Sequence, residues 1–378
     1  MKKHLVLVGG GHAHLLTLLH LSDYIKRGHR VTLISPSPYH YYSGMGPGML
    51  SGLYEDRQVR FHIEKMATDR EARFVEDRVV RIEPRDRILL LASGGSIAYD
   101  VASFNVGSEI PCEGMAVPQK RIIPVKPIHN LSYARRLVLE ELHDRKLRLL
   151  IVGGGAAGVE IAGNLWRLVH ANGGMAEIKL IAGQQLLKSF PSKVRSLALA
   201  SLSSRNIIVL EGTKVQTVDS FIANLTDGSS LAYDYVFIAV GVKPPALFRE
   251  SGLPLGEDGT GLLVNRHLQS IAYPEIFGGG DCITLEGDRL ARVGVYAVRQ
   301  NPVLQFNLMA ALEGAEMKAF SSGGSYMLIM NMGNERGILW KDGWVFYGRL
   351  GLVLKDFIDR RFMKKFQVSG EMRRTTDS

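Results

Sequence analysis

Two stretches of this chain, residues 4–21 and residues 149–162, carry the same pattern: an apolar run, a cluster of glycines and an apolar helical period. The pattern predicts a strand, a tight turn and a helix. The turn needs glycine because its backbone must take positive φ and let a phosphate approach, while the following helix points unpaired N–H groups at that phosphate. The sequence therefore predicts two nucleotide sites.

The two turns differ in how completely they match the dinucleotide fingerprint G-x-G-x-x-G. The second turn fills all three places: Gly153, Gly155 and Gly158. The first turn has Gly9 and Gly11, but His14 stands at the third place, where Gly or Ala normally allows close packing of helix on strand. The first match is weak when taken alone, whereas the second is strong.

The two halves repeat in register beyond the turns, which predicts two domains of one kind. Residues 96–100 read Ser-Ile-Ala-Tyr-Asp and precede Gly107, just as residues 230–234 read Ser-Leu-Ala-Tyr-Asp and precede Gly241. In both halves, the strand after the first helix lacks the acid that normally binds a ribose hydroxyl, and in the first half it ends at Ser35. The choice between NAD and NADP therefore stays open.

The composition limits the class of protein. The chain has 378 residues, 46% of them hydrophobic, which is enough for two or three domains with cores. Its net charge of +9 fits an acidic ligand, an anionic membrane surface or nucleic acid as partner. The two cysteines, Cys112 and Cys282, argue against a disulfide-stapled fold and favour a reduced, cytoplasmic setting. No stretch reaches about 18 uncharged apolar residues, so any membrane contact is expected to be peripheral.

Two further segments favour a bound ring and its phosphates. The loop at 36–48 is rich in tyrosine and glycine, which suits a planar ring, although packing on its own domain is an equal alternative. An apolar strand predicted at 274–277 is followed by three glycines and Asp281. That carboxylate could accept sugar hydroxyls while backbone amides meet phosphate, but the segment could equally be a simple turn. The helix predicted after Gly294 points its positive end at the same region.

With these features assembled, the chain resembles the flavoproteins with two dinucleotide-binding domains of the pyridine nucleotide-disulfide oxidoreductase superfamily. Residues 42–48 and 295–300 are similar to the branch that holds type II NADH dehydrogenases and sulfide:quinone oxidoreductases. Within that branch, the chain most resembles the oxidoreductase domain fused ahead of selenide, water dikinase. The resemblance covers residues 4 to about 366.

The resemblance implies an α/β fold with two Rossmann-like domains in tandem, the second inserted in the first, and a small C-terminal α+β region. The FAD-binding domain is expected to comprise residues 1–115 and 255–320, and the NAD(P)H-binding domain residues 116–254. Prolines between 111 and 127 mark the crossover. Residues 321–378 would form a C-terminal hairpin and helix.

The resemblance also assigns residues to the cofactors. The expected FAD contacts are Gly9, Gly11, His12, Ser35, Pro47, Val79, Gly107, Asp281, Val295 and Tyr296. The expected NAD(P)H contacts are Gly153, Gly155, Gly158 and Gly241. Glu160 and Gln300 are the candidate catalytic residues and are expected to orient the reactants. Type II dehydrogenases use an Ala-Gln-x-x-x-Gln run near the quinone. In the matching stretch of this chain, Gln300 is the one residue of that run that is present.

These features predict an FAD-dependent oxidoreductase in which NAD(P)H reduces the flavin and the flavin reduces an acceptor, with a quinone as the first choice. A flavoprotein of selenium or sulfur metabolism and a flavin redox sensor without turnover are the alternatives. Disulfide chemistry is not expected, because the chain has no Cys-x-x-Cys. No metal site is expected, because His12 and His14 lack nearby acids in the sequence. Nucleic acid is not an expected partner.

After residue 325 the sequence no longer follows the nucleotide-binding pattern and predicts a hairpin and a helix. Aromatic residues flank a Lys-Asp-Gly turn at 341–343 and predict a hairpin. A helix is predicted over 349–366, with apolar residues at every fourth place: Leu350, Leu354, Ile358, Phe362 and Phe366. The remaining places include Lys355, Arg360, Arg361, Lys364 and Lys365. Such a helix suits the cytoplasmic face of an anionic membrane, or docking on the protein body or on a second copy in a homodimer.

Overall fold

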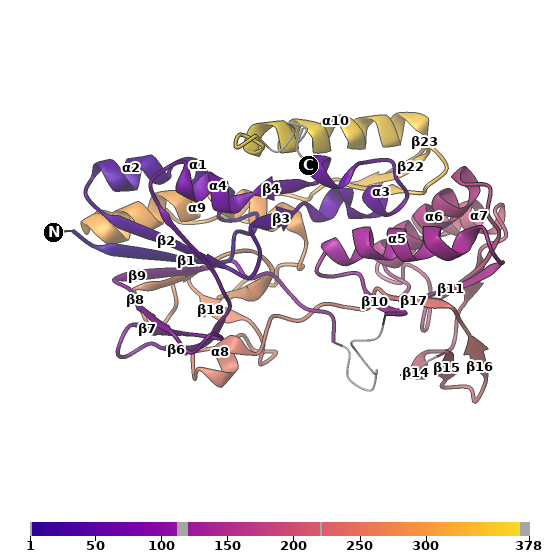
Figure 1. Cartoon of the computed structure of the whole chain (residues 1–378), viewed down its shortest axis with the longest axis horizontal. Helices are drawn as coiled ribbons and strands as arrows, with labels where there is room; N and C mark the ends of the chain where they lie inside the picture. The colour runs from indigo at the N-terminus through magenta and orange to yellow at the C-terminus, as the bar shows by residue number, and fades with distance from the viewer. Residues whose placement is uncertain (1, 112–119, 220, 371–378) are drawn as a thin grey trace.

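The computed structural model describes residues 2–111, 120–219 and 221–370. Figure 1 shows two α/β halves side by side, with a C-terminal helix along the top of the view. The first half is built on a five-stranded parallel sheet. Its strands lie in the order β19 (Ile276–Gly278), β9 (Val101–Phe104), β1 (His4–Val8), β2 (Arg30–Ser35) and β5 (Arg73–Glu76).

The second half repeats this sheet. Its parallel strands lie in the order β10 (Ile122–Pro124), β17 (Tyr235–Ile238), β11 (Leu147–Val152), β12 (Ala176–Ile181) and β13 (Ile208–Leu210). In both sheets the strand that enters a glycine turn is central, and the chain leaves the first sheet after β9 and returns at β19. This arrangement confirms the predicted fold class of two Rossmann-like domains, the second inserted in the first.

Each half also carries a three-stranded antiparallel sheet, placed between corresponding strands of the repeat. The first consists of β6 (Val79–Glu83), β7 (Ile88–Leu91) and β8 (Ser96–Ala98). The second consists of β14 (Val215–Val218), β15 (Ile222–Leu225) and β16 (Ser230–Ala232). The matched Ser-x-Ala-Tyr-Asp segments therefore hold the last strand of each small sheet.

Helices cover the two main sheets, so their strands are buried as near-continuous apolar runs. In the first half, α9 (Gly294–Glu313) packs on β9 and β19, and α1 (Leu15–Leu19) packs on α9. In the second half, α6 (Ala156–Ala171) packs on β11 and β12. The other covering helices there are α5 (His129–Leu142) on β10 and α7 (Ser192–Ser203) on β13. Leu5, Leu7 and Ile151 are fully buried at the sheet centres.

The predicted loop at 36–48 is more regular than expected. It contains β3 (Tyr39–Tyr41), which pairs with β4 (Arg60–His62), followed by the single turn η1 (Ser43–Met45) and the short helix α3 (Gly46–Leu50). All residues of α3 are buried, because α3 packs against α5 and α6 of the second half. This segment therefore joins the two halves.

Short elements complete the two halves. They are α2 (Leu21–Lys26), η2 (Asp56–Gln58), α4 (Ile63–Thr68), α8 (Leu247–Glu250), β18 (Leu262–Val264), η3 (Gly280–Cys282) and β20 (Ile283–Leu285). The helix after the first turn is thus broken at His20 into α1 and α2. The turn η3 matters for the site, because it follows β19 and carries the predicted Asp281.

The C-terminal region has the predicted hairpin and helix. An antiparallel sheet is formed by β21 (Leu328–Asn331), β22 (Gly337–Lys341) and β23 (Trp344–Gly348), and α10 (Arg349–Phe366) follows directly. The helix packs on this sheet and also reaches α1 and β4 of the first half, while β21 packs on α6 of the second. The C-terminal region therefore lies over the junction of the halves (Figure 1).

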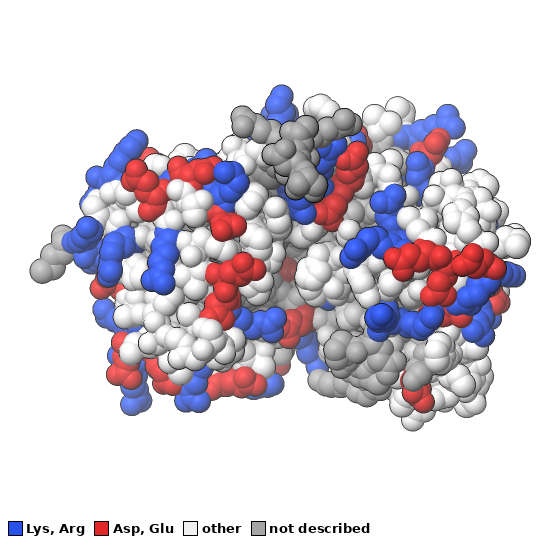
Figure 2. Space-filling view, in the orientation of Figure 1, with Lys and Arg blue, Asp and Glu red and all other residues white. Residues whose placement is uncertain are grey.

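The surface charges are mixed rather than segregated. Figure 2 shows Lys and Arg interspersed with Asp and Glu over the face in view, so the net charge of +9 does not form one basic field there. Across the described ranges, no helix combines the length and apolar character that crossing a membrane requires.

Candidate functional site

The first glycine turn follows β1 and is held by Asn105. Gly9 has φ +83°, and a side chain there would collide with the main-chain oxygen of Asn105. A side chain at Gly11 would collide with the Asn105 amide. The Asn105 Oδ1 accepts the N–H of Ala13 at 2.9 Å, and Nδ2 donates to the carbonyl of Gly279 at 2.5 Å. Asn105 thus pins the turn to the end of β19.

His14, the departure from the first fingerprint, is part of the same turn. Its Nδ1 lies 2.6 Å from the carbonyl of Gly9 and its Nε2 lies 2.8 Å from the hydroxyl of Ser103 on β9. A carbonyl can only accept, so Nδ1 carries the proton and Nε2 accepts from Ser103. Burial lowers the pKa of His14 to about 4, which keeps the ring neutral. The imidazole therefore joins the turn to the neighbouring strand.

The second turn achieves close packing with glycines alone. Gly153 has φ +130°, and a side chain there would collide with the carbonyl of Ala239. A side chain at Gly158 would collide with the carbonyl of Gly153. Gly155 differs, because a Cβ there would meet no described atom within 4 Å. Gly155 also precedes α6, whose N-terminus has no side-chain cap. Open space before free N–H groups suits a dinucleotide phosphate.

Four of the predicted FAD contacts lie at one edge of the first sheet. Gly9 follows β1, Ser35 ends β2, Gly107 follows β9, and Asp281 follows β19. These are the carboxyl ends of parallel strands, where ligands bind in open α/β sheets. The structure therefore brings these four residues together along one edge.

The other predicted contacts are placed as follows. Val295 and Tyr296 lie in the first turn of α9, which packs on η3, and Pro47 lies in α3 between the halves. Val79 begins β6, and Gly241 follows β17 in the second sheet. Their assignment to cofactors stays a prediction.

Asp281 is held by two groups that the sequence did not single out. Its Oδ2 accepts from the Lys126 ammonium and from the Ser108 hydroxyl, both at 2.8 Å, and Lys126 also donates to Ser108 at 2.9 Å. Gln300 is 1% exposed, and its Oε1 accepts the N–H of Gly280 at 2.6 Å. Gln300 thus supports the turn η3, and its predicted role near an acceptor is untested.

His12 lies at the same edge with an unsatisfied nitrogen. Its Nδ1 is 3.2 Å from Nε2 of His40, and its ring lies 5.3 Å from Tyr42 and 5.9 Å from Phe362, between ring centres. Its buried Nε2 has no hydrogen-bond partner among the described residues. Burial, with the nearby charge of Lys126, lowers the pKa of His12 to about 4. A buried nitrogen without a partner is a group that a ligand could satisfy.

Glu160 occupies the junction of the halves, on the first turns of α6. Its Oε1 accepts the N–H of Asn331, at the end of β21, at 2.7 Å. The side chain is partly exposed, yet burial of the carboxyl raises its pKa to about 7. The positive charge of Lys355 opposes this shift, and the carboxylate of Asp359 adds to it. Glu160 can therefore hold or release a proton near neutral pH.

The inner face of α10 carries a buried ion pair, and Lys355, named above among the basic residues of the helix, is one of its members. Lys355 and Asp359 are 12% and 6% exposed and lie 2.7 Å apart. Lys355 also donates to the carbonyl of Gly44 at 2.6 Å, and Tyr42 donates to Asp359 Oδ1 at 3.0 Å. These bonds fix α10 to the segment that joins the halves.

The outer face of α10 is apolar. Leu350, Val353 and Phe357 are 72%, 62% and 61% exposed, and Trp344 at the hairpin tip is 81% exposed. A helix that docks on a soluble protein normally buries its apolar stripe. In the first half of α10 the apolar residues face outward, whereas Met363 and Phe366 near its end are buried.

The described cysteine and histidines show no metal or disulfide chemistry. Burial raises the pKa of the Cys282 thiol to about 12, so the thiol is not ionised at neutral pH. Cys112 lies outside the described residues. Within the described ranges, no group of three His, Cys, Asp or Glu side chains could hold a metal ion.

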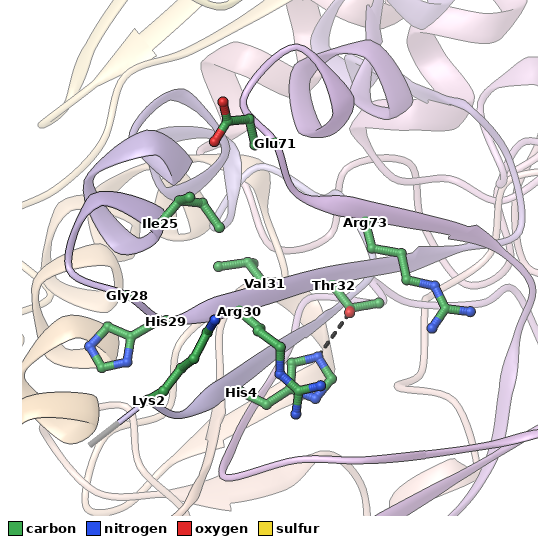
Figure 3. Close-up of a pocket in the computed structure, with 10 residues that line it drawn as sticks. All are labelled: Lys2, His4, Ile25, Gly28, His29, Arg30, Val31, Thr32, Glu71 and Arg73. Atoms are coloured by element: carbon green, nitrogen blue, oxygen red, sulfur yellow. Dashed lines mark hydrogen bonds between the residues drawn. The ribbon is translucent and has the colours of Figure 1, made fainter.

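A cavity of about 350 Å³ lies at the opposite edge of the first sheet (Figure 3). It is lined by His4, Arg30 and Arg73, which begin β1, β2 and β5, and by Thr32, whose hydroxyl lies 2.9 Å from the His4 ring. These are the amino ends of parallel strands. The cavity is therefore distinct from the edge that carries the glycine turn.

The residues present fit FAD at the first turn and a nicotinamide nucleotide at the second. At the first turn, the buried Nε2 of His12 has no hydrogen-bond partner within the described chain. At the second turn, the space beside Gly155 is open. The carboxylate of Asp281 lies at the same edge of the sheet as the first turn, with Lys126 beside it, and its predicted contact with sugar hydroxyls stays a prediction.

Sequence reasoning missed Asn105, Lys126 and Asp359, and it gave Tyr42 and Lys355 no role of their own in the site. Two signals could have found some of them. In the internal repeat, Asn105 is equivalent to Ala239. A polar residue at this position beside a glycine turn is therefore a difference between the halves that the sequence shows. Lys355 and Asp359 are four residues apart, a spacing that favours an ion pair on one helix face.

Comparisons with known proteins show the family of the chain. A family model described as pyridine nucleotide-disulphide oxidoreductase matches residues 3–303. The chain is 24% identical over 318 residues to ferroptosis suppressor protein 1 of Taeniopygia guttata, covering 79% of each chain. It is 23% identical over 394 residues to the type II NADH:quinone oxidoreductase of Staphylococcus saprophyticus, covering 96% of each.

Solved structures share the fold at low identity. NDH2 from Plasmodium falciparum in complex with NADH has a TM-score of 0.82 at 15% identity, covering 98% of this chain and 99% of that one. The sulfide:quinone oxidoreductase from Aquifex aeolicus has a TM-score of 0.78 at 14% identity, covering 99% and 93%. With the family model spanning most of its length, the chain belongs to the pyridine nucleotide-disulphide oxidoreductase family.

Proposed function

We propose that the protein is an FAD-dependent NAD(P)H:quinone oxidoreductase. The observation that carries the proposal is the pair of glycine turns on two repeated sheets, with Glu160 at the junction between them. Relatives named type II NADH:quinone oxidoreductase and alternative NAD(P)H-ubiquinone oxidoreductase support a quinone as acceptor. The overall reaction converts NAD(P)H, a quinone and one proton into NAD(P)⁺ and a quinol.

FAD belongs at the first turn. In this assignment the turn at Gly9 and Gly11 lies at the pyrophosphate, the Asp281 carboxylate accepts from a sugar hydroxyl and the Ser35 hydroxyl bonds to another. His12 Nε2 gains the partner it lacks among the described residues. When bound, the flavin accepts a hydride from the nicotinamide and passes two electrons to the acceptor. The second turn, within the proposed domain 116–254, holds NAD(P)H through Gly153, Gly155, Gly158 and Gly241.

Glu160 is the proposed proton donor, a more active role than orientation alone. The reaction takes up one proton, and a carboxyl with a pKa of about 7 is partly protonated at neutral pH. Its bond to the Asn331 N–H holds one carboxyl oxygen in place. Lys126 and Gln300 have a supporting role, because they hold Asp281 and the N–H of Gly280.

The test separates the two half-reactions in purified, FAD-loaded protein. Without oxygen, NADH or NADPH should bleach the yellow flavin, and a short-chain quinone should restore the colour. We expect Glu160→Gln to leave the bleaching rate within about threefold and to slow reoxidation by about 100-fold, within the usual range for loss of an acid catalyst. Equal slowing of both steps would remove Glu160 from the proton-donor role.

The same experiment decides between the functional alternatives. Bleaching without reoxidation by any quinone would favour a flavoprotein of selenium or sulfur metabolism, or a redox sensor. Protein that binds no flavin would sink the proposal. The ratio of rates with NADH and NADPH gives the nucleotide preference.

The outer face of α10 supports peripheral contact with an anionic membrane. Its exposed apolar side chains are followed along the helix by exposed basic residues: Arg360, Arg361, Lys364 and Lys365. Apolar burial combined with attraction to anionic lipid is the binding mode of interfacial helices. The proposed location is therefore the cytoplasmic membrane face.

Point variants test this contact without disturbing the inner face. Replacing Leu350, Val353 and Phe357 together by Gln should release the protein from anionic liposomes by at least about tenfold while flavin content stays unchanged. Met175→Gln, at an exposed position of the second half, is the matched control. If the triple variant keeps its liposome affinity, the membrane assignment fails. If it instead converts a dimer into a monomer, the outer face is a homodimer interface.

A further inference from the structure

The loop after β12 lies against the second glycine turn. The N–H of Gly153 donates to the carbonyl of Ile181 at 2.9 Å, where the strand ends. The N–H of Leu187 donates to the carbonyl of Gly154 at 2.7 Å, and a side chain at Gly154 would collide with the carbonyl of Ala182. Both ends of this loop are therefore fixed beside the turn that we assign to the nicotinamide nucleotide.

The repeat identifies the residue of this loop that corresponds to the usual ribose-binding acid. In the first half, the N–H of Gly9 donates to the residue before Ser35. In the second half, the N–H of Gly153 donates to the residue before Ala182. Ala182 therefore stands at the end of the strand where an acid normally binds the ribose 2′-hydroxyl of NAD(H). Its methyl group cannot accept a hydrogen bond from that hydroxyl.

The loop supplies no carboxylate, and those on the neighbouring strands have other partners. Residues 182–190 contain neither Asp nor Glu. Glu211, which follows β13, accepts a loop N–H at 2.6 Å through Oε1 and pairs with Arg195 at 2.7 Å through Oε2. Asp227, in the turn between β15 and β16, accepts from the hydroxyl of Ser229 at 2.6 Å. Neither carboxylate is free to take over the role of the missing acid.

Lysine side chains stand at this place instead. Lys188 is exposed, and its ammonium donates to Gln184 Oε1 at 2.6 Å. Gly183 follows Ala182, and a Cβ on Gly183 would lie 3.9 Å from Cγ of Lys214. An ammonium has three donors, so the Lys188 ammonium keeps two of them for a ligand. The charge at the end of β12 therefore suits an anion.

The backbone before Lys188 is held in an uncommon conformation. Leu187 has φ +50°, although it is not a glycine, and the side chains of Leu186 and Leu187 are buried. A residue keeps such a conformation only where its surroundings fix it, and such residues are frequent in ligand-binding segments. Burial of the two leucines and the bond of Leu187 to Gly154 hold the backbone of Lys188 in place beside the turn.

We propose that the second turn prefers NADPH to NADH, and that Lys188 determines this preference by binding the ribose 2′-phosphate. The inference rests on the proposed function and names the nucleotide that serves it. A phosphate monoester carries about two negative charges at neutral pH, and its oxygens accept charge-assisted hydrogen bonds from an ammonium. NADH offers a 2′-hydroxyl there instead. The hydride comes from the nicotinamide in either nucleotide, so the choice is made in binding.

The experiment measures the dissociation constants of NADP⁺ and NAD⁺ by calorimetric titration of the purified, FAD-loaded protein. We expect the parent protein to bind NADP⁺ about tenfold more tightly, the ratio that one charge-assisted hydrogen bond supports. Lys188→Gln should weaken NADP⁺ binding about tenfold and leave NAD⁺ binding within about twofold. Gln184→Glu should also weaken NADP⁺ binding more than NAD⁺ binding, because the new carboxylate pairs with Lys188 and repels the phosphate.

Lys146→Gln is the matched control. Lys146 is exposed and precedes β11 at the opposite edge of the second sheet, so this substitution should leave both dissociation constants unchanged. The ³¹P resonance of the 2′-phosphate adds a reading at the phosphate itself. It should shift when NADP⁺ binds to the parent protein or to the control variant, and it should shift less with Lys188→Gln.

The outcomes separate this inference from the proposed function. The inference would be overturned if the parent protein bound NAD⁺ as tightly as NADP⁺. It would also be overturned if Lys188→Gln left the NADP⁺ affinity unchanged or weakened both nucleotides equally. FAD-loaded parent protein that binds neither nucleotide would instead overturn the proposed function.

Discussion

In each glycine turn, the residue at the third fingerprint position lies against the carbonyl of the first glycine, but the two turns use different residues there. In the second turn, Gly158 lies so close to the carbonyl of Gly153 that no side chain fits. In the first turn, the His14 ring fills the equivalent place and donates its Nδ1–H to the carbonyl of Gly9. The comparison teaches that the third fingerprint position lies against that carbonyl, and that it accepts either a residue without a side chain or a ring that donates a hydrogen bond to the carbonyl.

The largest expected effect comes from copying the first turn into the second. Gly158→His would drive a side chain into the carbonyl of Gly153, and its far nitrogen would face Phe237, which stands where the first half has Ser103. We expect a loss of about 4 kcal/mol in unfolding free energy and no measurable binding of NADH. Urea denaturation and NADH titration measure both. A stable variant that binds NADH would break the comparison.

The reverse change should have a smaller effect. His14→Gly leaves the buried carbonyl of Gly9 and the hydroxyl of Ser103 without partners and opens a cavity between α1 and β9. We expect a loss of about 3 kcal/mol in unfolding free energy, since each unsatisfied buried group costs about 1–3 kcal/mol. Flavin content should fall while the second turn is unaffected. Unchanged flavin content at unchanged stability would contradict the role given to the imidazole.

The smallest effect is a pH dependence carried by His14. Its pKa is lowered to about 4 in the folded protein, so the folded state binds fewer protons than the unfolded state below pH 6.5. The contribution is fully present above pH 6.5 and is lost as the pH falls toward 4. We expect His14→Gln, which keeps a donor but does not titrate, to remove about 2 kcal/mol of the difference in unfolding free energy between pH 7 and pH 5. An identical pH dependence in parent and variant would show that the His14 ring does not titrate in this way.

Local patterns in the sequence predicted the elements, but not the contacts that complete the site. The helix at 349–366 and the hairpin before it follow from periodicity and turn residues within the segment. His14 and Ser103 are 89 positions apart, and Lys126 and Asp281 are 155 apart, so no local pattern indicates either contact. The repeat predicted two domains of one kind, because the same pattern occurs twice in one chain.

For the C-terminal helix as well, the sequence predicted the element but not its contacts with the rest of the protein. Its apolar stripe is visible in the sequence, but the stripe alone does not say which face meets the protein. The expectation of docking through apolar residues is natural for a soluble protein. The structure docks the second half of the helix through Met363 and Phe366, which are buried. It docks the middle of the helix through Lys355 and Asp359, for which the segment at 42–54 offers a carbonyl and a tyrosine hydroxyl. That segment comes from more than 300 positions earlier in the chain.

The central claim is that the first turn holds FAD and the second holds NAD(P)H, with Glu160 between them. A crystal structure of the full chain with FAD and NADH tests it most directly. We predict the FAD pyrophosphate at Gly9 and Gly11, and the NADH pyrophosphate at Gly155 before α6. FAD bound at the second turn, or NADH bound anywhere but that turn, would contradict the account.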